Sequence, residues 1–331
     1  IDGRTVNLTR MTRQDGDAGS YWFSHFERAD HPRQLPCYLT WTGPEVKDII
    51  QRHLLESALY GGAISGRGPR YCPSVEDKVV RFPDALRHQL FLEPEGLDTE
   101  ELYVNGLSTS LPAAVQRALL RAVPGLESVE MTRPGYAIEY DYFPPTQLHP
   151  SLESRALPGL FFAGQVNGTT GYEEAAGQGA VAGLNAALSV RGEEAVVLSR
   201  NEAMIGVLVD DLVHRGVDEP YRLFTSRAEF RILLRQDNAL RRLYPLARRL
   251  GLFNPEEVRI AETRLEAEER TSREAVETSI SPEVANPILE QAGESCIEEP
   301  TRIRELCRRP GVALAALLSA AGSSAKSEDA E

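Results

Sequence analysis

A single cysteine lies between two prolines in the segment GPRYCPSVEDKVVRF, residues 68–82. A cysteine whose pKa is lowered is a strong nucleophile near neutral pH, because the thiolate and not the thiol attacks. The prolines restrict the backbone around Cys72, and the positive charges of Arg70 and Lys78 would favour its thiolate. The competing interpretation is a half-buried structural cysteine, which is what most free cysteines are. These residues alone leave both interpretations open.

A second candidate site is the glycine-rich segment GLFFAGQVNGTTGYEEAAGQGAVAGLNAAL, residues 159–188. We expect a hydrophobic strand up to Gly164, then a loop, and then a helix that starts near Gly171 and ends near Leu188. Three further glycines inside that helix cost about 1 kcal/mol each relative to alanine, so they indicate close approach by a strand or a flat cofactor. The helix start offers free N–H groups to an anion or an electron-rich ring edge. Tight packing of helix on sheet without any ligand explains the glycines equally well.

The third feature is a basic segment from Arg222 to Arg249, which holds eight arginines and only two acidic residues. The chain as a whole carries a net charge of −13, which by itself disfavours nucleic-acid binding. A basic island in an acidic protein is nevertheless the pattern expected of a face that meets phosphate. The S-x-x-E pattern at Ser226 predicts a helix start, and arginines three or four residues apart would then form one stripe. The alternative is a solvated helix face, with some arginines paired to Glu229 or Asp237.

The elements that must position these residues follow from hydrophobic periodicity and turn signals. We expect strands over residues 34–42, 78–82, 88–94 and 135–143, and helices over 46–59 and 112–125. From about residue 195 the chain reads as nearly all helix. There, Ser199 and Glu202 form a predicted capping box, and glycines at 216 and 251 are expected to end two helices.

Composition limits the class of protein. With 331 residues, 42% hydrophobic and 26% charged, the chain is long enough for two or three domains with buried cores. No apolar run reaches the length of a membrane span. The four cysteines form no CxxC pair, which argues against a zinc site or a disulfide framework and suits a reducing cytoplasm. The chain starts at Ile1 and reads as part of a longer polypeptide, with a disordered tail expected from about residue 321.

Several segments together resemble one family closely. GPRYCPSVEDKVVRF and AGQVNGTTGYEEAAGQGAVAGLNA are similar to the two signature segments of the MnmG (GidA) family, and DEPYRLFTSRAEFRILLRQDNA, residues 218–239, is similar to a third block. EGLDTEELYVNGLSTSLP and RPGYAIEYDYFPPTQL resemble others, so the likeness runs almost continuously to about residue 255. The FAD-binding Rossmann unit with its phosphate loop, with which the family begins, has no counterpart here, and neither has the family's final helical segment.

The resemblance implies a function and a set of partners. Members of the family are FAD-dependent enzymes that modify C5 of the wobble uridine (U34) of certain tRNAs in the cytoplasm. They use NAD(H) and a methylene-tetrahydrofolate one-carbon unit, with ammonium or glycine, act together with the GTPase MnmE, and form homodimers. Uracil C5 becomes nucleophilic once a group adds at C6, and Cys72 is the candidate for that addition, with a role as proton carrier left open.

The resemblance also assigns residues to the cofactors and to tRNA. The FAD contacts would come from the turn and helix start, namely Gly164, Gln165, Asn167, Gly171, Tyr172 and Glu173. The NAD region would be Gly68, Pro69, Arg70, Tyr71, Cys72, Pro73, Ser74, Val75, Glu76, Asp77, Lys78, Val79, Val80, Arg81 and Phe82. The tRNA contacts would be Arg222, Arg227, Arg231 and Arg235. No metal site is expected.

The predicted fold class is α/β: part of an FAD/NAD(P)-binding Rossmann-like domain with an inserted α+β subdomain, followed by an all-helical domain. The expected limits are 1–67 for the inserted subdomain, 68–195 for the FAD-domain portion and 196–331 for the helical domain. Two other functions stay possible from sequence. One is a non-catalytic module that binds tRNA or the GTPase. The other is a folate- and FAD-dependent tRNA uracil-5-methyltransferase, which the long extension after residue 195 disfavours.

Overall fold

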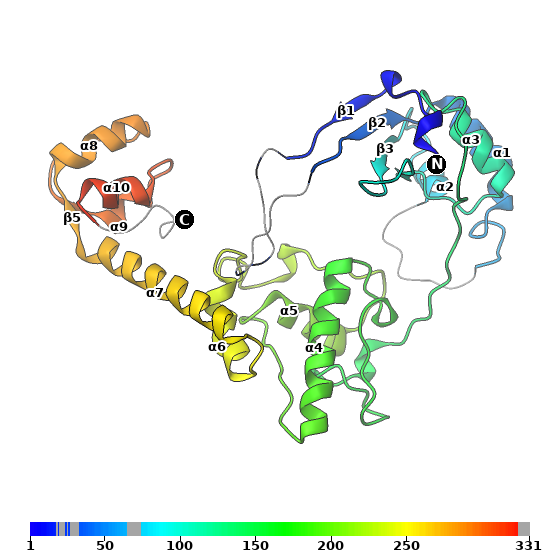
Figure 1. Cartoon of the computed structure of the whole chain (residues 1–331). Helices are drawn as coiled ribbons and strands as arrows, with labels where there is room; N and C mark the ends of the chain where they lie inside the picture. Colours follow the sequence, from blue (N-terminus) through cyan, green and yellow to red (C-terminus); the bar gives the residue numbers. More distant parts are fainter. Residues whose placement is uncertain (18, 20–23, 25, 27–32, 65–73, 324–331) are drawn as a thin grey trace. The chain divides into compact units, whose positions relative to one another are not determined.

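The structure is a computed structural model that describes residues 1–17, 19, 24, 26, 33–64 and 74–323. The chain is of mixed α/β type and divides into two compact units, the first made of Ile1–Tyr21 and Ala29–Leu234 and the second of Trp22–Arg28 and Arg235–Glu331. Figure 1 colours the chain along its sequence and labels most of the helices and strands of both units. The predicted mixed α/β class is therefore confirmed at this level.

The first unit opens with a four-stranded antiparallel sheet in the order β1-β2-β3-β4. Leu39 pairs with Thr12 on one side and with Phe91 on the other, and Phe91 pairs in turn with Asn105. Parallel pairing in the described residues is limited to one isolated bridge, between Thr169 and Tyr221. The strands are β1 Thr12–Gln14, β2 Cys37–Trp41, β3 Gln89–Pro94 and β4 Leu102–Asn105.

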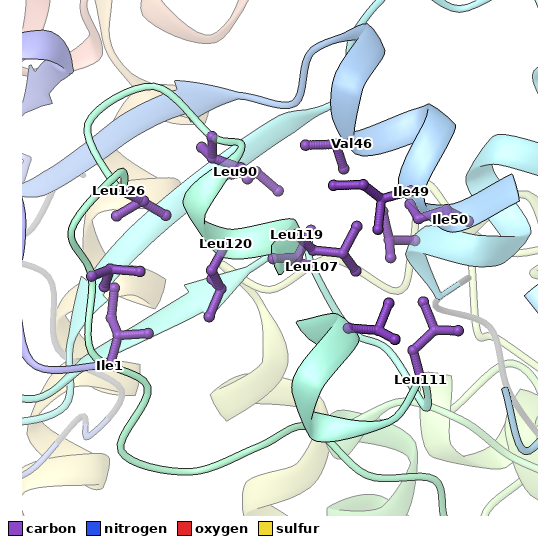
Figure 2. Close-up of a cluster of buried hydrophobic side chains, with 14 of the residues drawn as sticks. Ile1, Val46, Ile49, Ile50, Leu90, Leu107, Leu111, Leu119, Leu120 and Leu126 are labelled. Carbon is purple, nitrogen blue, oxygen red and sulfur yellow. The ribbon is translucent and has the colours of Figure 1, made fainter. Parts of the chain in front are cut away.

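Three helices cover one face of this sheet and enclose its core: α1 Pro44–His53, α2 Val75–Arg81 and α3 Ala113–Arg121. Leu90 and Leu92 alternate along β3 with less buried neighbours, as the period of two requires when one face is packed. Figure 2 shows Leu90 with Ile50 of α1 and Leu119 of α3, all three fully buried. The core runs from Ile1 to Val129, so it crosses residue 67, where a domain limit was expected.

The predicted strand over residues 78–82 is wrong, because this segment belongs to helix α2. Ser74 caps the helix: its Oγ accepts a hydrogen bond from the Asp77 backbone N–H, and the Asp77 carboxylate accepts one from the Ser74 N–H in return. This reciprocal capping box satisfies the free donors of a helix start. Val75 and Val79 then lie four residues apart on the buried side. The apparent alternation of KVVRF is part of a helical stripe.

The remainder of the first unit has less regular structure than expected. Residues 135–143 form no strand and are mostly exposed, so that prediction is wrong. The strand expected before Gly164 is reduced to a single bridge between Glu153 and Phe161. The long helix is confirmed as α4 Tyr172–Arg191, and α5 Met204–Asp210 continues into a π-helical turn, Asp211–Arg215, that ends at Gly216 as predicted.

The helix predicted from Ser226 is also wrong. A short 3-10 turn, Thr225–Arg227, is followed by further turns, and the next helix starts only at residue 239. Glu229, the predicted capping partner, is bound by the guanidinium of Arg200 instead. The Ser199–Glu202 hydrogen bonds do form, but α5 starts after them, with Ala203 as its N-cap.

The second unit is mainly helical but not all-helical. Two two-residue strands, β5 Ser279–Ile280 and β6 Thr301–Arg302, pair antiparallel. Its helices are α6 Ala239–Arg249, α7 Pro255–Glu277, α8 Pro282–Gln291, α9 Ile303–Leu306 and α10 Leu314–Ala320. Gly251, at a φ of +64°, follows α6 as predicted. Ala321 caps α10 and Ser323 bonds Glu274, while the rest of the expected tail lies outside the described residues. Among the described helices, none combines the length and apolar character needed to cross a bilayer.

Candidate functional site

The glycine-rich turn links Phe162 to α4 through two glycines with a positive φ. Gly164 has a φ of +87° and precedes a 3-10 turn, Gln165–Asn167, and Gly168 ends that turn at the same φ. A Cβ on Gly168 would lie 2.7 Å from a methyl carbon of Val217. Both the backbone angle and the lack of space therefore require glycine here.

A buried amide holds this turn in place. The side chain of Gln178, on the second turn of α4, is fully buried. Its Oε1 accepts hydrogen bonds from Gly164 N–H at 3.2 Å and from Asn167 Nδ2 at 2.8 Å. Its Nε2 donates to Thr169 Oγ1 at 2.9 Å and to the carbonyl of Glu174 at 3.0 Å. One residue thus fixes both ends of the turn to the helix.

The start of α4 is shaped by a buried glutamate. Glu174 is 3% exposed, and its Oε1 accepts a hydrogen bond from Leu223 N–H at 2.8 Å and lies 3.3 Å from Arg222 Nε. A Cβ on Gly171 would come within 1.7 Å of Glu174 Oε2, so a larger residue would force this carboxylate to move. No side chain caps the helix at Gly171. The carboxylate connects the helix start to the basic segment.

The other residues predicted at the turn differ in exposure. Tyr172, the first residue of α4, is 94% exposed, Glu173 is exposed, and Gln165 is half-buried. Asn167 is fully buried, and its Oδ1 makes no hydrogen bond to the described part of the chain. Tyr172, Glu173 and Gln165 are therefore accessible to a ligand, whereas Asn167 shapes the turn from within.

The glycines inside α4 have different causes. A Cβ on Gly177 would lie 3.3 Å from Ile205 of α5, so the helices approach closely there. At Gly179 and Gly183 a Cβ would meet nothing within 4 Å. Packing of helix on helix therefore explains the first glycine, and the contacts of the described residues do not explain the other two.

The structure sorts the four predicted tRNA-binding arginines into different environments. Arg222 faces the buried Glu174. Arg227 stacks on a tyrosine ring, with its guanidinium carbon 4.3 Å from the ring centroid of Tyr221. Arg231 is exposed, and Arg235, at the start of the second unit, pairs with Asp237 at 2.5 Å, one of the two pairings considered from sequence. The four do not form a helical stripe.

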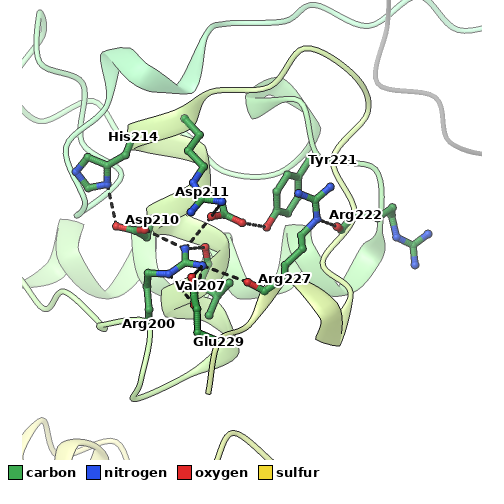
Figure 3. Close-up of polar contacts among 10 residues, drawn as sticks. Arg200, Val207, Asp210, Asp211, His214, Tyr221, Arg222, Arg227 and Glu229 are labelled. Carbon is green, nitrogen blue, oxygen red and sulfur yellow. Dashed lines mark hydrogen bonds and ion pairs between the residues drawn. The ribbon is translucent and has the colours of Figure 1, made fainter. Parts of the chain in front are cut away.

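Arg200 is the centre of a polar network that sequence reasoning missed. Its guanidinium donates to Asp211 Oδ1 at 2.7 Å, to Asp210 Oδ2 at 2.9 Å and to both oxygens of Glu229. It also donates to the backbone carbonyl of Arg227 at 3.2 Å. Figure 3 shows these contacts converging on Arg200. Asp210 and Asp211 thus pair with an arginine, and no His, Cys, Asp or Glu cluster in the described residues could hold a metal ion.

The pKa shifts in this network follow its contacts. The hydrogen bond from Arg200 lowers the pKa of Glu229 below its usual range. Burial, and next the hydrogen bond that its hydroxyl donates to Asp211, raise the pKa of Tyr221. Hydrogen bonds to Glu229 first, and then to the two aspartates, raise the pKa of Arg200. The phenol therefore stays neutral and the guanidinium charged across the physiological pH range.

Cys72 and residues 68–73 of the predicted NAD region lie outside the described residues. The rest of that region forms the capped helix α2, anchored by several contacts. The carboxylate of Glu76, 1% exposed, accepts hydrogen bonds from Thr109 Oγ1 at 2.8 Å and Ser110 N–H at 3.0 Å. Lys78 Nζ donates to the carbonyl of Gly106 at 2.9 Å, so its charge is used in an intrachain contact.

The turn has features that fit the edge of a flat, electron-rich ring. In the described part of the chain, the start of α4 has no side-chain cap at Gly171, and the half-buried Gln165 lies in the turn before it. The chain has no G-x-G-x-x-G that follows a strand and opens a helix, which is the usual fingerprint for a dinucleotide pyrophosphate. The residues of the turn therefore fit the ring edge of a flavin.

Comparisons with known proteins agree with this architecture. The model of the family described as "Glucose inhibited division protein A" matches residues 1–194. A Salinibacter ruber protein named "tRNA uridine 5-carboxymethylaminomethyl modification enzyme MnmG" is 50% identical over 325 residues, which cover 97% of this chain and 49% of that protein. An Aquifex aeolicus protein of the same name is 54% identical over 272 residues, covering 78% of this chain and 43% of that one.

A solved structure of Aquifex aeolicus GidA, in its form I crystal, matches with a TM-score of 0.75 at 46% identity, covering 95% of this chain and 54% of the other. The chain spans about half the length of the curated relatives it matches. Fold and sequence thus define a mixed α/β protein with a GidA-type architecture. The chain belongs to the glucose inhibited division protein A family.

Proposed function

We propose that this chain is part of a flavin-dependent enzyme that modifies C5 of the wobble uridine of tRNA, adding an aminomethyl or carboxymethylaminomethyl group. The observation that carries the proposal is that the glycine-rich turn pairs with Tyr221, the residue directly before the basic segment. Tyr221 N–H donates to the carbonyl of Gly168 at 3.0 Å, and Thr170 N–H donates to the carbonyl of Tyr221 at 3.1 Å. Arg222, which pairs with Glu174, and Arg227, which stacks on Tyr221, are therefore neighbours of the proposed ring-edge site, as an enzyme acting on RNA requires.

Different residues of the chain would bind the cofactor and act on the substrate. Gln165 and the N–H groups of Gly171 to Glu173 would hold the ring edge, with Gly164 giving close access and Tyr172 accessible beside it. When bound, FAD would supply hydride transfer, with NAD(H) as the reductant and methylene-tetrahydrofolate as the one-carbon source. Cys72 would add to C6 of the uracil or carry a proton.

The substrate and partners follow from the same proposal. Arg222, Arg227 and Arg231 would contact the phosphates of tRNA from the first unit, and Arg235 would do so from the second. The proposal also includes the GTPase MnmE as a partner and a homodimer as the assembly. It further includes a cytoplasmic location, a Rossmann-like portion and an NAD region over residues 68–82.

Two experiments test the proposal. Flavin absorbance of the purified chain with added FAD, compared between the wild type and Gln165→Met, tests the ring-edge site. For the catalytic role, the chain would be joined to the N-terminal half of a relative, and wobble-uridine modification would be measured in cells lacking their own enzyme. We expect Cys72→Ser to abolish modification and Cys37→Ser, in strand β2, to leave it intact. Full modification by the Cys72 variant would remove that assignment.

A non-catalytic module that binds tRNA or the GTPase is the second candidate. The observation in its favour is the lack of a dinucleotide fingerprint in the chain. The two candidates differ in the flavin experiment. Salt-dependent tRNA binding without any flavin spectrum would favour the module, whereas a bound flavin would favour the enzyme.

A further inference from the structure

The side chain of Arg227 is held in one orientation although it is exposed. Its guanidinium lies over the ring of Tyr221, and its Nε donates to the carbonyl of Arg222 at 2.8 Å. Neither terminal nitrogen makes a hydrogen bond to the part of the chain that the structure describes. A planar guanidinium with its inner edge fixed and its outer N–H groups available matches the geometry of a phosphate.

The ring beneath Arg227 is itself immobilised. Tyr221 is 3% exposed, and its hydroxyl donates to Asp211 Oδ2 at 2.8 Å (Figure 3). Its backbone pairs with Gly168 and Thr170 of the glycine-rich turn. The platform is therefore fixed both at its hydroxyl end and along its main chain.

The carboxylate that holds the tyrosine is buried and balanced by charge. The side chain of Asp211 is 3% exposed, and its Oδ1 lies 2.7 Å from Arg200 Nη1 and 3.3 Å from Arg215 Nη1. Arg200 also binds the backbone carbonyl of Arg227 and the side-chain carboxylate of Glu229, so it holds the chain on both sides of residue 228. A buried carboxylate with these partners keeps one geometry, because any other would leave a charge unpaired.

We propose that Arg200, Asp211 and Tyr221 are positioning residues that hold Arg227 ready for a phosphodiester of the tRNA backbone. The proposal rests on the proposed function and adds to it which residue contacts the phosphate and which residues hold that residue in place. Side-chain entropy lost on binding weakens a flexible contact more than a fixed one. Arg227 should therefore contribute more to affinity than the exposed Arg231, and its contribution should depend on the platform.

The test is a double-mutant cycle on tRNA binding by the purified chain, with an unmodified tRNA transcript as the probe. Arg227→Gln should weaken binding about tenfold and reduce the slope of log K against log salt by about one, since one phosphate contact is lost. Tyr221→Phe keeps the ring but frees it from Asp211, and should weaken binding about threefold with an unchanged slope. In the Arg227→Gln background, Tyr221→Phe should have no further effect.

Tyr142→Phe is the matched control, because it removes a tyrosine hydroxyl that donates to the carbonyl of Val217 at 3.2 Å in the same unit. It should leave binding unchanged. Equal losses from Tyr221→Phe in both backgrounds would overturn the positioning role while leaving the phosphate contact standing. Wild-type affinity in Arg227→Gln would overturn the contact itself. If the wild-type chain shows no salt-dependent binding of tRNA, both the contact of Arg227 and the proposed tRNA site are wrong.

Discussion

Replacing Gln178 by methionine removes the amide that ties the glycine-rich turn to α4 while keeping a side chain of similar length and helix propensity. Four hydrogen bonds are lost, those with Gly164 N–H, Asn167 Nδ2, Thr169 Oγ1 and the carbonyl of Glu174. Three of these groups keep a partner. Asn167 Nδ2 still donates to the carbonyl of Phe162, and Thr169 Oγ1 still donates to the carbonyl of Gly164. The carbonyl of Glu174 lies within helix α4. The Gly164 N–H is left buried without an acceptor.

The expected loss of free energy follows from the contrast between the Gly164 N–H, which loses its acceptor, and the three groups that keep a partner. An unsatisfied buried donor costs about 1–3 kcal/mol, and each of the other lost bonds costs about 0.5–1.5 kcal/mol net. The buried methionine offsets part of the loss, since its apolar atoms leave water. We therefore expect the opening free energy of the turn to fall by about 3 kcal/mol, which is roughly a hundredfold in its opening equilibrium.

Peptide-level hydrogen exchange measures this change where it occurs. Peptides that cover residues 159–185 should exchange roughly a hundredfold faster in Gln178→Met than in the wild type, provided that they exchange through the local opening of the turn. Gln165→Met is the matched control, because the same substitution falls in the same turn at a half-buried side chain that makes no hydrogen bond to the described residues. Equal protection in the two variants would refute the assignment of Gln178 as the residue that fixes the turn.

Three further predictions concern stability. Gly168→Ala should destabilise the first unit in urea unfolding by more than about 2 kcal/mol, because a positive φ and a 2.7 Å contact both oppose a Cβ. The control Gly179→Ala should be neutral or stabilising by up to about 1 kcal/mol, because a Cβ there meets nothing within 4 Å. Leu289→Ala should cost the second unit about 2–5 kcal/mol, because the side chain is fully buried in its core; a smaller loss would mean that the core repacks. The pKa of Glu229 is lowered by Arg200, so the stability it contributes is present above its ordinary value of 4.5 and lost as the pH falls through the lowered value. Thermal unfolding of the wild type and Glu229→Gln should therefore differ at pH 7 and converge at acid pH.

Local signals predicted the elements that depend on neighbouring residues. The helices α1, α3 and α4 and the strands β2 and β3 lie where periodicity placed them, and the glycines at 216 and 251 end their helices. Prediction failed where a local pattern had a competing partner. Ser226 and Glu229 match a capping box, but Arg200 takes the glutamate. The alternating residues 135–143 lack a strand to pair with in the described chain, and alternation without a partner does not make a sheet.

In the candidate site, too, some residues were predictable from local sequence and others were not. Its glycines were visible in the sequence, because a run of glycines around a helix start is unusual in itself. Gln178 and Glu174 were visible only as polar residues inside a helix, and their position one turn apart near the helix start is the one signal that could have found them. Nothing in the local sequence indicated Arg200, since its partners lie 10, 11 and 29 residues further along the chain.

The sequence by itself determined the family, the long helix and the chemical types available: a thiol, a glycine-rich turn and a set of arginines. Tertiary structure decided which of those arginines has a fixed geometry, and that the turn and the basic segment are neighbours through Tyr221. The physical reason is that a buried charge or donor must find a partner wherever the fold brings one. The choice among possible partners is made by packing across long sequence separations, which local patterns do not encode.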